Sequence, residues 1–164
     1  MKSKKGFIIT SIILVAVTVG SFSIWLMPQN VQTKFVISNA RDDLDALIEQ
    51  QSTISDSTEE EFGKMISGEI TPDNYINIAE ISSSQINSMI IKVIQSEVPN
   101  EWKQSYADFD TFLRTYNTYL KETIVVANKL KQDQQADISE DKSKLDDLLK
   151  QADGFLENSN GSRP

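Results

Sequence analysis

The sequence predicts an all-α protein: an N-terminal single transmembrane helix followed by an antiparallel, up-and-down helical bundle of about four helices. Three observations support this prediction. An uncharged run of 22 residues lies near the start, and apolar residues recur at three- and four-residue spacing through the rest of the chain. Gly and Pro together contribute only ten of the 164 residues. Alternation typical of strands is short throughout, so no strand is expected.

The uncharged run covers residues 6–27, and Pro28 follows it. A helix of this length rises roughly 33 Å, enough for a hydrocarbon core of about 30 Å. We therefore expect a basic tail over residues 1–5 and a transmembrane signal-anchor helix over residues 6–28. The residues assigned to the membrane anchor are Phe7, Ile8, Ile9, Ile12, Ile13, Leu14, Val15, Val17, Trp25 and Leu26.

The charges around this segment predict its orientation. Lys2, Lys4 and Lys5 precede it, whereas only Lys34 and Arg41 carry positive charge in the next 15 residues. The positive-inside rule then places the N-terminus in the cytoplasm and the rest of the chain outside. The predicted location is the cell membrane, with a single span and an extracytoplasmic C-terminal domain.

A cleaved secretory signal is a second interpretation of the same segment. The small residues Gly20, Ser21 and Ser23 follow an apolar stretch and offer cleavage points. Cleavage there would release a free secreted bundle in place of an anchored one.

A third interpretation rests on Lys4-Lys5-Gly6, which is followed directly by the apolar run. This arrangement resembles the class III leaders of type IV pilins and archaeal pilins. The resemblance covers about 20 residues and implies a filament subunit processed after Gly6. Ser11 stands where bacterial pilins usually carry Glu, so the archaeal form fits better.

The extracytoplasmic bundle is expected over residues 29–157. A narrow apolar stripe predicts a helix over residues 35–54, a break at 55–58 and a short helix over 58–66 that ends at Gly68. Thr71-Pro72-Asp73 is a typical helix start and predicts a helix from Pro72 to about residue 97. The last two helices are expected over about 99–133 and 140–157, before a disordered tail at 158–164.

The composition excludes several kinds of chemistry. The chain contains no His and no Cys, so it cannot form a disulfide, a thiolate nucleophile, a Ser-His-Asp triad or a Cys/His metal site by itself. Its net charge of −8 argues against binding to nucleic acid. Acidic clusters at 42–45, 59–61 and 137–141 are expected to be solvated helix faces, with a weak cation site as the alternative. We predict no catalytic residue, no metal site and no cofactor, and expect that the protein is not an enzyme.

Aromatic residues concentrate in the helix predicted over 99–133. Trp102, Tyr106 and Tyr119 are the candidates for a partner-binding face, because Trp and Tyr combine apolar area with a polar tip. Trp102 lies at the helix end and Tyr119 lies off the main stripe, so these two are expected to be exposed. Packing in the bundle core is the alternative for all three.

These observations predict a non-catalytic accessory or scaffold subunit at the cell surface. Its expected partners are the lipid bilayer and another membrane or surface protein, and the stripe over 35–54 also permits a homo-oligomer. An extracytoplasmic sensory or ligand-binding module, similar in shape to the helical bundles of bacterial chemoreceptors, is the alternative. That alternative would require a pocket lined by residues 82–84 or by the tyrosines.

Overall fold

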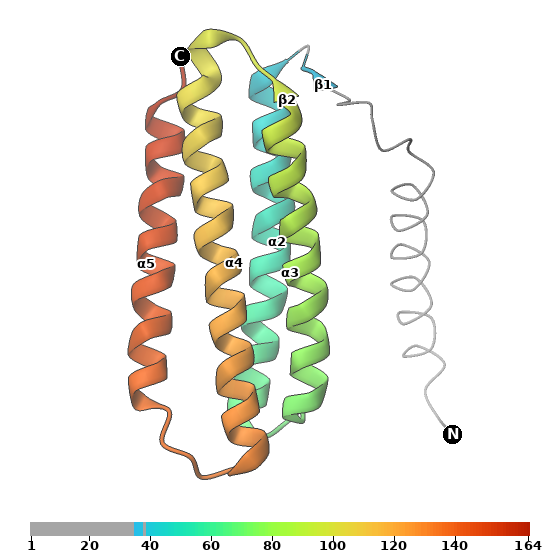
Figure 1. The fold of residues 1–164 in the computed structure, drawn as a ribbon, viewed down its shortest axis with the longest axis vertical. Coiled ribbons are helices and arrows are strands. Elements are labelled where there is room, and N and C mark those ends of the chain that lie inside the picture. Colours follow the sequence, from blue (N-terminus) through green and yellow to red (C-terminus); the bar gives the residue numbers. More distant parts are fainter. Residues whose placement is uncertain (1–34, 38) are drawn as a thin grey trace, which may run out of the picture. The chain divides into compact units, whose positions relative to one another are not determined.

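The computed structural model describes residues 35–37 and 39–164, which form four long helices packed antiparallel (Figure 1). The helices are α2 (Ala40–Ser67), α3 (Pro72–Gln95), α4 (Lys103–Gln132) and α5 (Ser139–Gly161). The predicted all-α class and the antiparallel four-helix arrangement are therefore confirmed. The predicted membrane anchor, residues 6–28, lies outside the described residues. Among the described helices, none is long and apolar enough to cross a bilayer.

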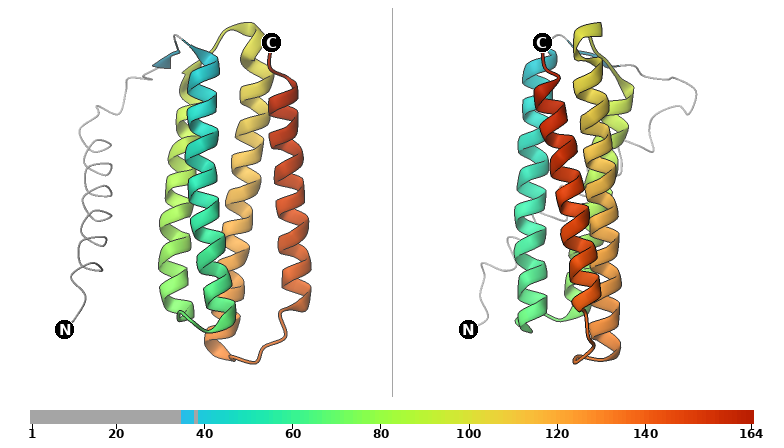
Figure 2. Two further views of the ribbon diagram at one scale, coloured as in Figure 1. Left: turned by 180° about the vertical axis from the view of Figure 1, so that it is seen from behind. Right: turned by 90° about the vertical axis from the view of Figure 1, so that its left-hand side faces the viewer.

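Helix α4 is the centre of the packing. It lies against α3 along one side and against α5 along the other, whereas α2 packs mainly on α3 and touches α4 only slightly (Figure 2). The most closely buried large side chains of α4 are Phe109, Leu113, Tyr116 and Leu120, which are at most 2 % exposed. A broad apolar face is what a helix with neighbours on both sides requires.

Helix α2 is continuous through residues 55–58, so the predicted break there is wrong. The hydroxyl groups that suggested a break bond to their own helix instead. Ser55 Oγ donates to the Ser52 carbonyl at 3.1 Å, and Thr58 Oγ1 donates to the Ile54 carbonyl at 2.7 Å. A hydroxyl that bonds the preceding turn no longer competes for backbone groups, and the helix carries on.

The first helix also begins later than predicted, at Ala40. Asn39 caps it by accepting a hydrogen bond from the Asp42 backbone nitrogen at 3.3 Å. Residues Phe35–Val36 form a short strand, β1, that pairs in parallel with β2 (Ser96–Glu97). The expectation that the chain contains no strand is therefore wrong, and the helix predicted to run to about residue 97 ends at Gln95.

The turn between α2 and α3 follows the sequence prediction. Gly68 ends α2 with a φ of 81°, a left-handed conformation that favours glycine. Thr71 then caps α3 by accepting a hydrogen bond from the Asn74 backbone nitrogen, and Pro72 occupies the first turn.

The connection from α3 to α4 contains a single 3-10 turn, η1 (Asn100–Trp102). Pro99 precedes this turn, and α4 then begins at Lys103 rather than near residue 99. The prediction of one long helix in this part of the chain is therefore correct apart from its first turn.

The C-terminal residues are part of the bundle rather than a tail that begins at residue 158. Helix α5 continues to Gly161 because Ser105 and Ser159 join it to α4. Ser105 Oγ donates to the Ser159 carbonyl at 2.6 Å, and Ser159 Oγ donates to the Ser105 carbonyl at 2.8 Å. Beyond the helix, Arg163 forms an ion pair with Asp45 of α2 at 2.6 Å.

Buried hydroxyl groups connect α2 to α3 inside the bundle. The hydroxyls of Thr58 and Ser82 lie 2.8 Å apart, and both residues are buried. Since the Thr58 hydrogen goes to the Ile54 carbonyl, the Ser82 hydroxyl must be the donor between them. The partner of Ser82 is therefore supplied by a different helix, which fixes the register of α2 against α3.

We predict that Thr58→Val lowers the free energy of unfolding by about 1–3 kcal/mol, because valine keeps the shape but leaves the Ser82 hydroxyl buried without its acceptor. Denaturant unfolding followed by circular dichroism measures this change. Thr53→Val is the matched control, since Thr53 makes the same bond to its own helix, at 3.0 Å, on an exposed surface. We expect a change of less than about 0.5 kcal/mol for the control, and equal effects of the two variants would contradict the prediction.

Candidate binding groove between α2 and α5

An open groove runs between α2 and α5, and α4 forms its floor. The two helices scarcely contact each other, because α2 packs on α3 and α5 packs on α4. Figure 2 shows α4 between them in the left-hand view. At one end the ion pair between Arg163 and Asp45 joins the two sides.

The groove contains two hollows. The first, about 240 Å³, lies between the middle of α2 and the C-terminal half of α5, and its walls include Ser52, Ser55 and Ala152. The second, about 320 Å³, lies nearer to Gly63 and Lys142. Glu59 and Leu149 line both hollows, so the two are neighbours along one groove.

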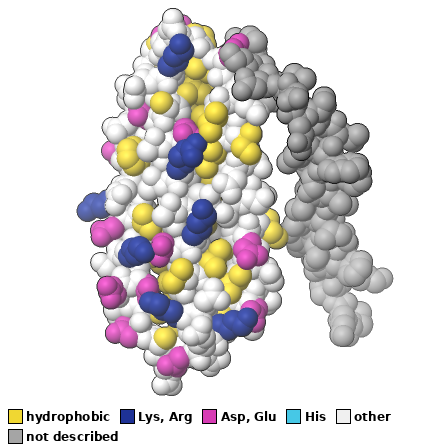
Figure 3. Space-filling view, in the orientation of Figure 1, with side chains coloured by type: hydrophobic (Ala, Val, Ile, Leu, Met, Phe, Trp, Pro, Cys, Tyr) yellow, Lys and Arg dark blue, Asp and Glu magenta, His cyan; other side chains and the backbone are white. Residues whose placement is uncertain are grey.

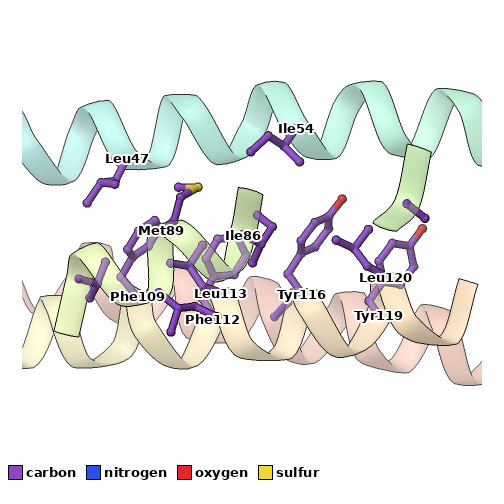
Figure 4. Close-up of a cluster of buried hydrophobic side chains, with 14 of the residues drawn as sticks. Leu47, Ile54, Ile86, Met89, Phe109, Phe112, Leu113, Tyr116, Tyr119 and Leu120 are labelled. Atoms are coloured by element: carbon purple, nitrogen blue, oxygen red, sulfur yellow. The ribbon is translucent and has the colours of Figure 1, made fainter. Parts of the chain in front are cut away.

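Aromatic side chains of α4 form the floor of the groove. The rings of Phe109, Phe112, Tyr116 and Tyr119 follow one another with successive centroid separations of 5.6, 6.4 and 5.5 Å. Figure 4 shows these side chains rising from α4 inside the hydrophobic cluster. Phe112 and Tyr116 line the first hollow, and Tyr119 lines the second.

The hydroxyl group of Tyr116 has no hydrogen-bond partner among the described residues. The side chain is 2 % exposed, and in Figure 4 its oxygen points toward α2. Burial raises the pKa of this phenol well above its usual range, so the group stays protonated and can donate as well as accept. Ser55 lies beside the hydroxyl and lowers its pKa, against the larger effect of burial. Because the Ser55 hydrogen goes to the Ser52 carbonyl, Ser55 Oγ could serve Tyr116 only as an acceptor, and the phenol oxygen has no donor among the described residues. A buried polar group without a partner is uncommon and calls for an explanation.

Two other buried tyrosines, Tyr75 and Tyr106, have hydroxyl contacts inside the bundle. Tyr75 donates to Thr123 Oγ1 at 2.7 Å. Burial, the largest influence, raises the pKa of Tyr75 to about 12. Tyr106 lies 3.0 Å from the Ala40 carbonyl and 3.2 Å from Asp43 Oδ2. Two other buried side-chain atoms among the described residues, Asp110 Oδ1 and Arg163 Nε, also lack a partner, but both belong to side chains that form an ion pair through another atom.

The rim of the groove is acidic. Glu59 comes from α2, and Asp146 and Asp153 come from α5. None of the three forms an ion pair with Lys or Arg within the described part of the chain, and Lys142 is the one basic residue that lines the two hollows. Partial burial raises the pKa of the Glu59 carboxyl, and the charges of Asp56 and Asp153 raise it further. The rim therefore holds negative charges that repel one another.

The structure separates the residues predicted to form a partner face. Trp102 is half-buried at the start of α4 and packs against the core. Tyr106 is buried and used in the bond to the α2 N-terminus, and Tyr119 is also buried, so the expectation that Tyr119 is exposed is wrong. Of the three, only Tyr119 lines the groove. Tyr119 lies off the main apolar stripe of α4, but it is buried because α4 packs against helices on both sides. The buried face of α4 is therefore broader than one stripe.

The serines at 82–84 do not line the groove. Ser82 forms a hydrogen bond with Thr58 of α2, and Ser83 donates to Asn117 Oδ1 of α4 at 2.6 Å. Both side chains therefore join α3 to a neighbouring helix. Tyr116, Glu59 and Asp153 were not singled out by sequence reasoning as a group. Glu59 and Asp153 follow ordinary surface spacing, and only the packing of α2 and α5 around Tyr116 brings the three to one place.

The described residues show which groups the groove presents to a ligand. No group of three or more Asp or Glu residues there is placed to hold a metal ion. The groove offers carboxylates, hydroxyl groups and half-buried aliphatic side chains, which can bind cations and apolar chains.

Another apolar feature lies on the outer surface. Ile81, Ile91 and Ile94 of α3 and Val125 of α4 are exposed. In the view of Figure 3, hydrophobic side chains are scattered among charges of both signs rather than gathered in one large patch. Scattered exposed side chains of this kind are normal for a folded protein, and the groove remains the stronger candidate site.

Comparison with known proteins adds no family to this description: no family model, characterised protein or solved structure matches the chain.

We predict that Glu59→Gln raises the midpoint of denaturation at pH 7. Because the folded-state pKa of Glu59 lies above its ordinary value, ionisation of this carboxyl destabilises the folded protein as pH rises through that range. The gain should shrink toward pH 4, where the carboxyl becomes protonated, and urea unfolding at both pH values measures it.

Glu60→Gln is the matched control, one position along the same helix. The hydrogen bond from Lys64, at 2.6 Å, lowers the pKa of Glu60. Its ionised form is therefore favoured in the folded state, and the control should leave the midpoint at pH 7 unchanged or lower it slightly. A lower midpoint for Glu59→Gln than for Glu60→Gln would show that the rim charges do not repel.

Proposed function

We propose that the chain is a membrane-tethered, non-catalytic binding subunit that presents the groove between α2 and α5 outside the cell. The observation that carries the proposal is the Tyr116 hydroxyl, buried and unpartnered within the described residues on the floor of an open groove. A buried hydroxyl group without a partner costs free energy, because it has lost its hydrogen bonds to water. A ligand or partner segment that enters the groove would supply the missing bond.

The tether in this proposal comes from the sequence. Residues 6–28 form the predicted anchor, and the three lysines before them favour a cytoplasmic N-terminus. In this proposal a second membrane protein senses whether the groove is occupied. Tethering keeps the bundle at a high effective concentration beside such a partner.

The ligand-binding alternative is supported by the same groove. It differs from the accessory-subunit proposal only in the occupant, a small molecule in place of a partner segment. The pilin-like alternative, in contrast, depends on processing after Gly6 and not on any feature of the bundle.

The absence of cysteine from the sequence makes a direct test of the tethered arrangement possible. We predict that the Ser52→Cys variant, altered in the wall of the groove, reacts with a membrane-impermeant maleimide on intact cells. The Lys2→Cys variant should react only after permeabilisation, because the proposal places residue 2 in the cytoplasm. Intact mass of the labelled protein should correspond to the full-length chain, with or without Met1.

Other outcomes would overturn this proposal in distinct ways. A new N-terminus after Gly6 would favour the filament subunit, and one near residues 20–23 would favour a free secreted bundle. Labelling of position 2 but not position 52 on intact cells would reverse the orientation.

The groove itself is tested by crosslinking. A benzophenone attached to the thiol of the Ser52→Cys variant should crosslink to a discrete membrane protein. The same probe on the Ser84→Cys variant, at an exposed position of α3 outside the groove, should not. Identical crosslinks from both positions would show that the groove does not select the partner.

A further inference from the structure

The shape of the groove limits what can enter it. Gln51 and Tyr116 lie at its bottom and are 4 % and 2 % exposed, so the walls stand close together there. A helix of about 10 Å diameter cannot reach such a floor. A slender, unbranched chain can lie along both hollows, which share Glu59 and Leu149.

The floor and the rim of the groove favour different chemical groups on a ligand. The half-buried side chains of Ile48, Leu149 and Leu156 offer apolar surface suited to methylene groups. Glu59, Asp146 and Asp153 offer negative charge above that surface, without a Lys or Arg ion pair in the described chain. Asp146 and Asp153 are two turns apart on α5, about 10 Å along the groove, and Glu59 comes from the opposite wall.

From this juxtaposition we infer that the groove binds a linear aliphatic polyamine, a chain of methylene groups that carries ammonium groups at intervals. One ammonium would lie between Glu59 and Asp153 and another beside Asp146, while the methylene groups would cover the half-buried aliphatic side chains that line the groove. The inference rests on the proposed binding function and specifies the ligand for the same groove.

The hydroxyl of Tyr116, unpartnered among the described residues, gives independent support. An ammonium group donates hydrogen bonds and accepts none, and a neutral phenol oxygen is an available acceptor. A simple divalent metal ion would find the rim carboxylates but would gain nothing from the methylene-binding floor.

The test is a calorimetric titration of the full-length chain in nanodiscs of zwitterionic phosphatidylcholine, with lipid-only nanodiscs as the blank. Spermidine is the probe, and Mg²⁺ and hexanediol are the comparison ligands. We expect saturable binding of spermidine, and much weaker binding of Mg²⁺, which lacks the chain, and of hexanediol, which lacks the charge.

The variants compare charges in the groove with charges elsewhere. Glu59→Gln combined with Asp153→Asn should weaken spermidine binding by about tenfold or more, because two charge-assisted contacts are lost. Glu80→Gln combined with Glu101→Gln removes the same net charge from exposed positions on α3 and η1, and should change the affinity by less than about twofold. Circular dichroism of each variant confirms that the bundle is folded.

Three results would overturn the inference. If the two double variants lose spermidine affinity equally, the overall negative charge of the protein explains the binding. If Mg²⁺ binds saturably with similar affinity, the methylene chain plays no part in binding. If spermidine does not bind while position 52 still crosslinks to a membrane partner, the polyamine assignment fails alone and the proposed binding function stands. If neither is observed, both fail.

Discussion

Helix α4 determines the arrangement of the other three helices because it is buried on two sides. Its broad apolar face accepts α3 along one side and α5 along the other. Helix α2 then finds its main contact on α3, through the Thr58–Ser82 hydroxyl pair and the apolar side chains around it. Helix α2 packs on α3, whereas α5 packs on α4. Because α2 and α5 pack on different helices, they do not contact each other along their middle, and the groove lies between them.

The end of the groove nearest the C-terminus is fixed by polar contacts. Arg163 pairs with Asp45 there, and Tyr106 contacts the Ala40 carbonyl. The reciprocal Ser105–Ser159 bonds hold α5 to α4 at the same end. These contacts set the distance between α2 and α5 without filling the space between them. The carboxylates of the rim then lie above a mixed lining of aliphatic and aromatic side chains, the Gln51 amide and the tyrosine hydroxyls.

Local signals in the sequence predicted most of the fold. The cap at Thr71, the glycine at position 68 and the apolar spacing of α3 and α4 act within a few residues, and the structure agrees with them. The errors in the predicted helix ends and strands arose where a residue far away in the sequence determines the local structure. Helix α5 continues past residue 158 because Ser159 exchanges hydrogen bonds with Ser105, 54 residues away, and β1 forms because Ser96 and Glu97 pair with it.

The groove could not be predicted for the same reason. Glu59 and Asp153 look like ordinary surface acids in the sequence, and Tyr116 looks like one core aromatic among several. Only the packing of α2 and α5 on different neighbours places the three together. The anchor prediction belongs to residues outside the described part of the chain, and it rests on hydropathy and charge alone.

The most direct measurement of the central claim compares the free energy of unfolding of Tyr116→Phe with that of Tyr106→Phe. Tyr106 makes a buried hydrogen bond, so its loss should cost about 0.5–1.5 kcal/mol. The Tyr116 hydroxyl makes none with the described residues, so its removal should leave the free energy of unfolding unchanged or raise it. A loss for Tyr116→Phe as large as that for Tyr106→Phe would show that the hydroxyl is already satisfied in the fold, and would contradict its assignment to a ligand.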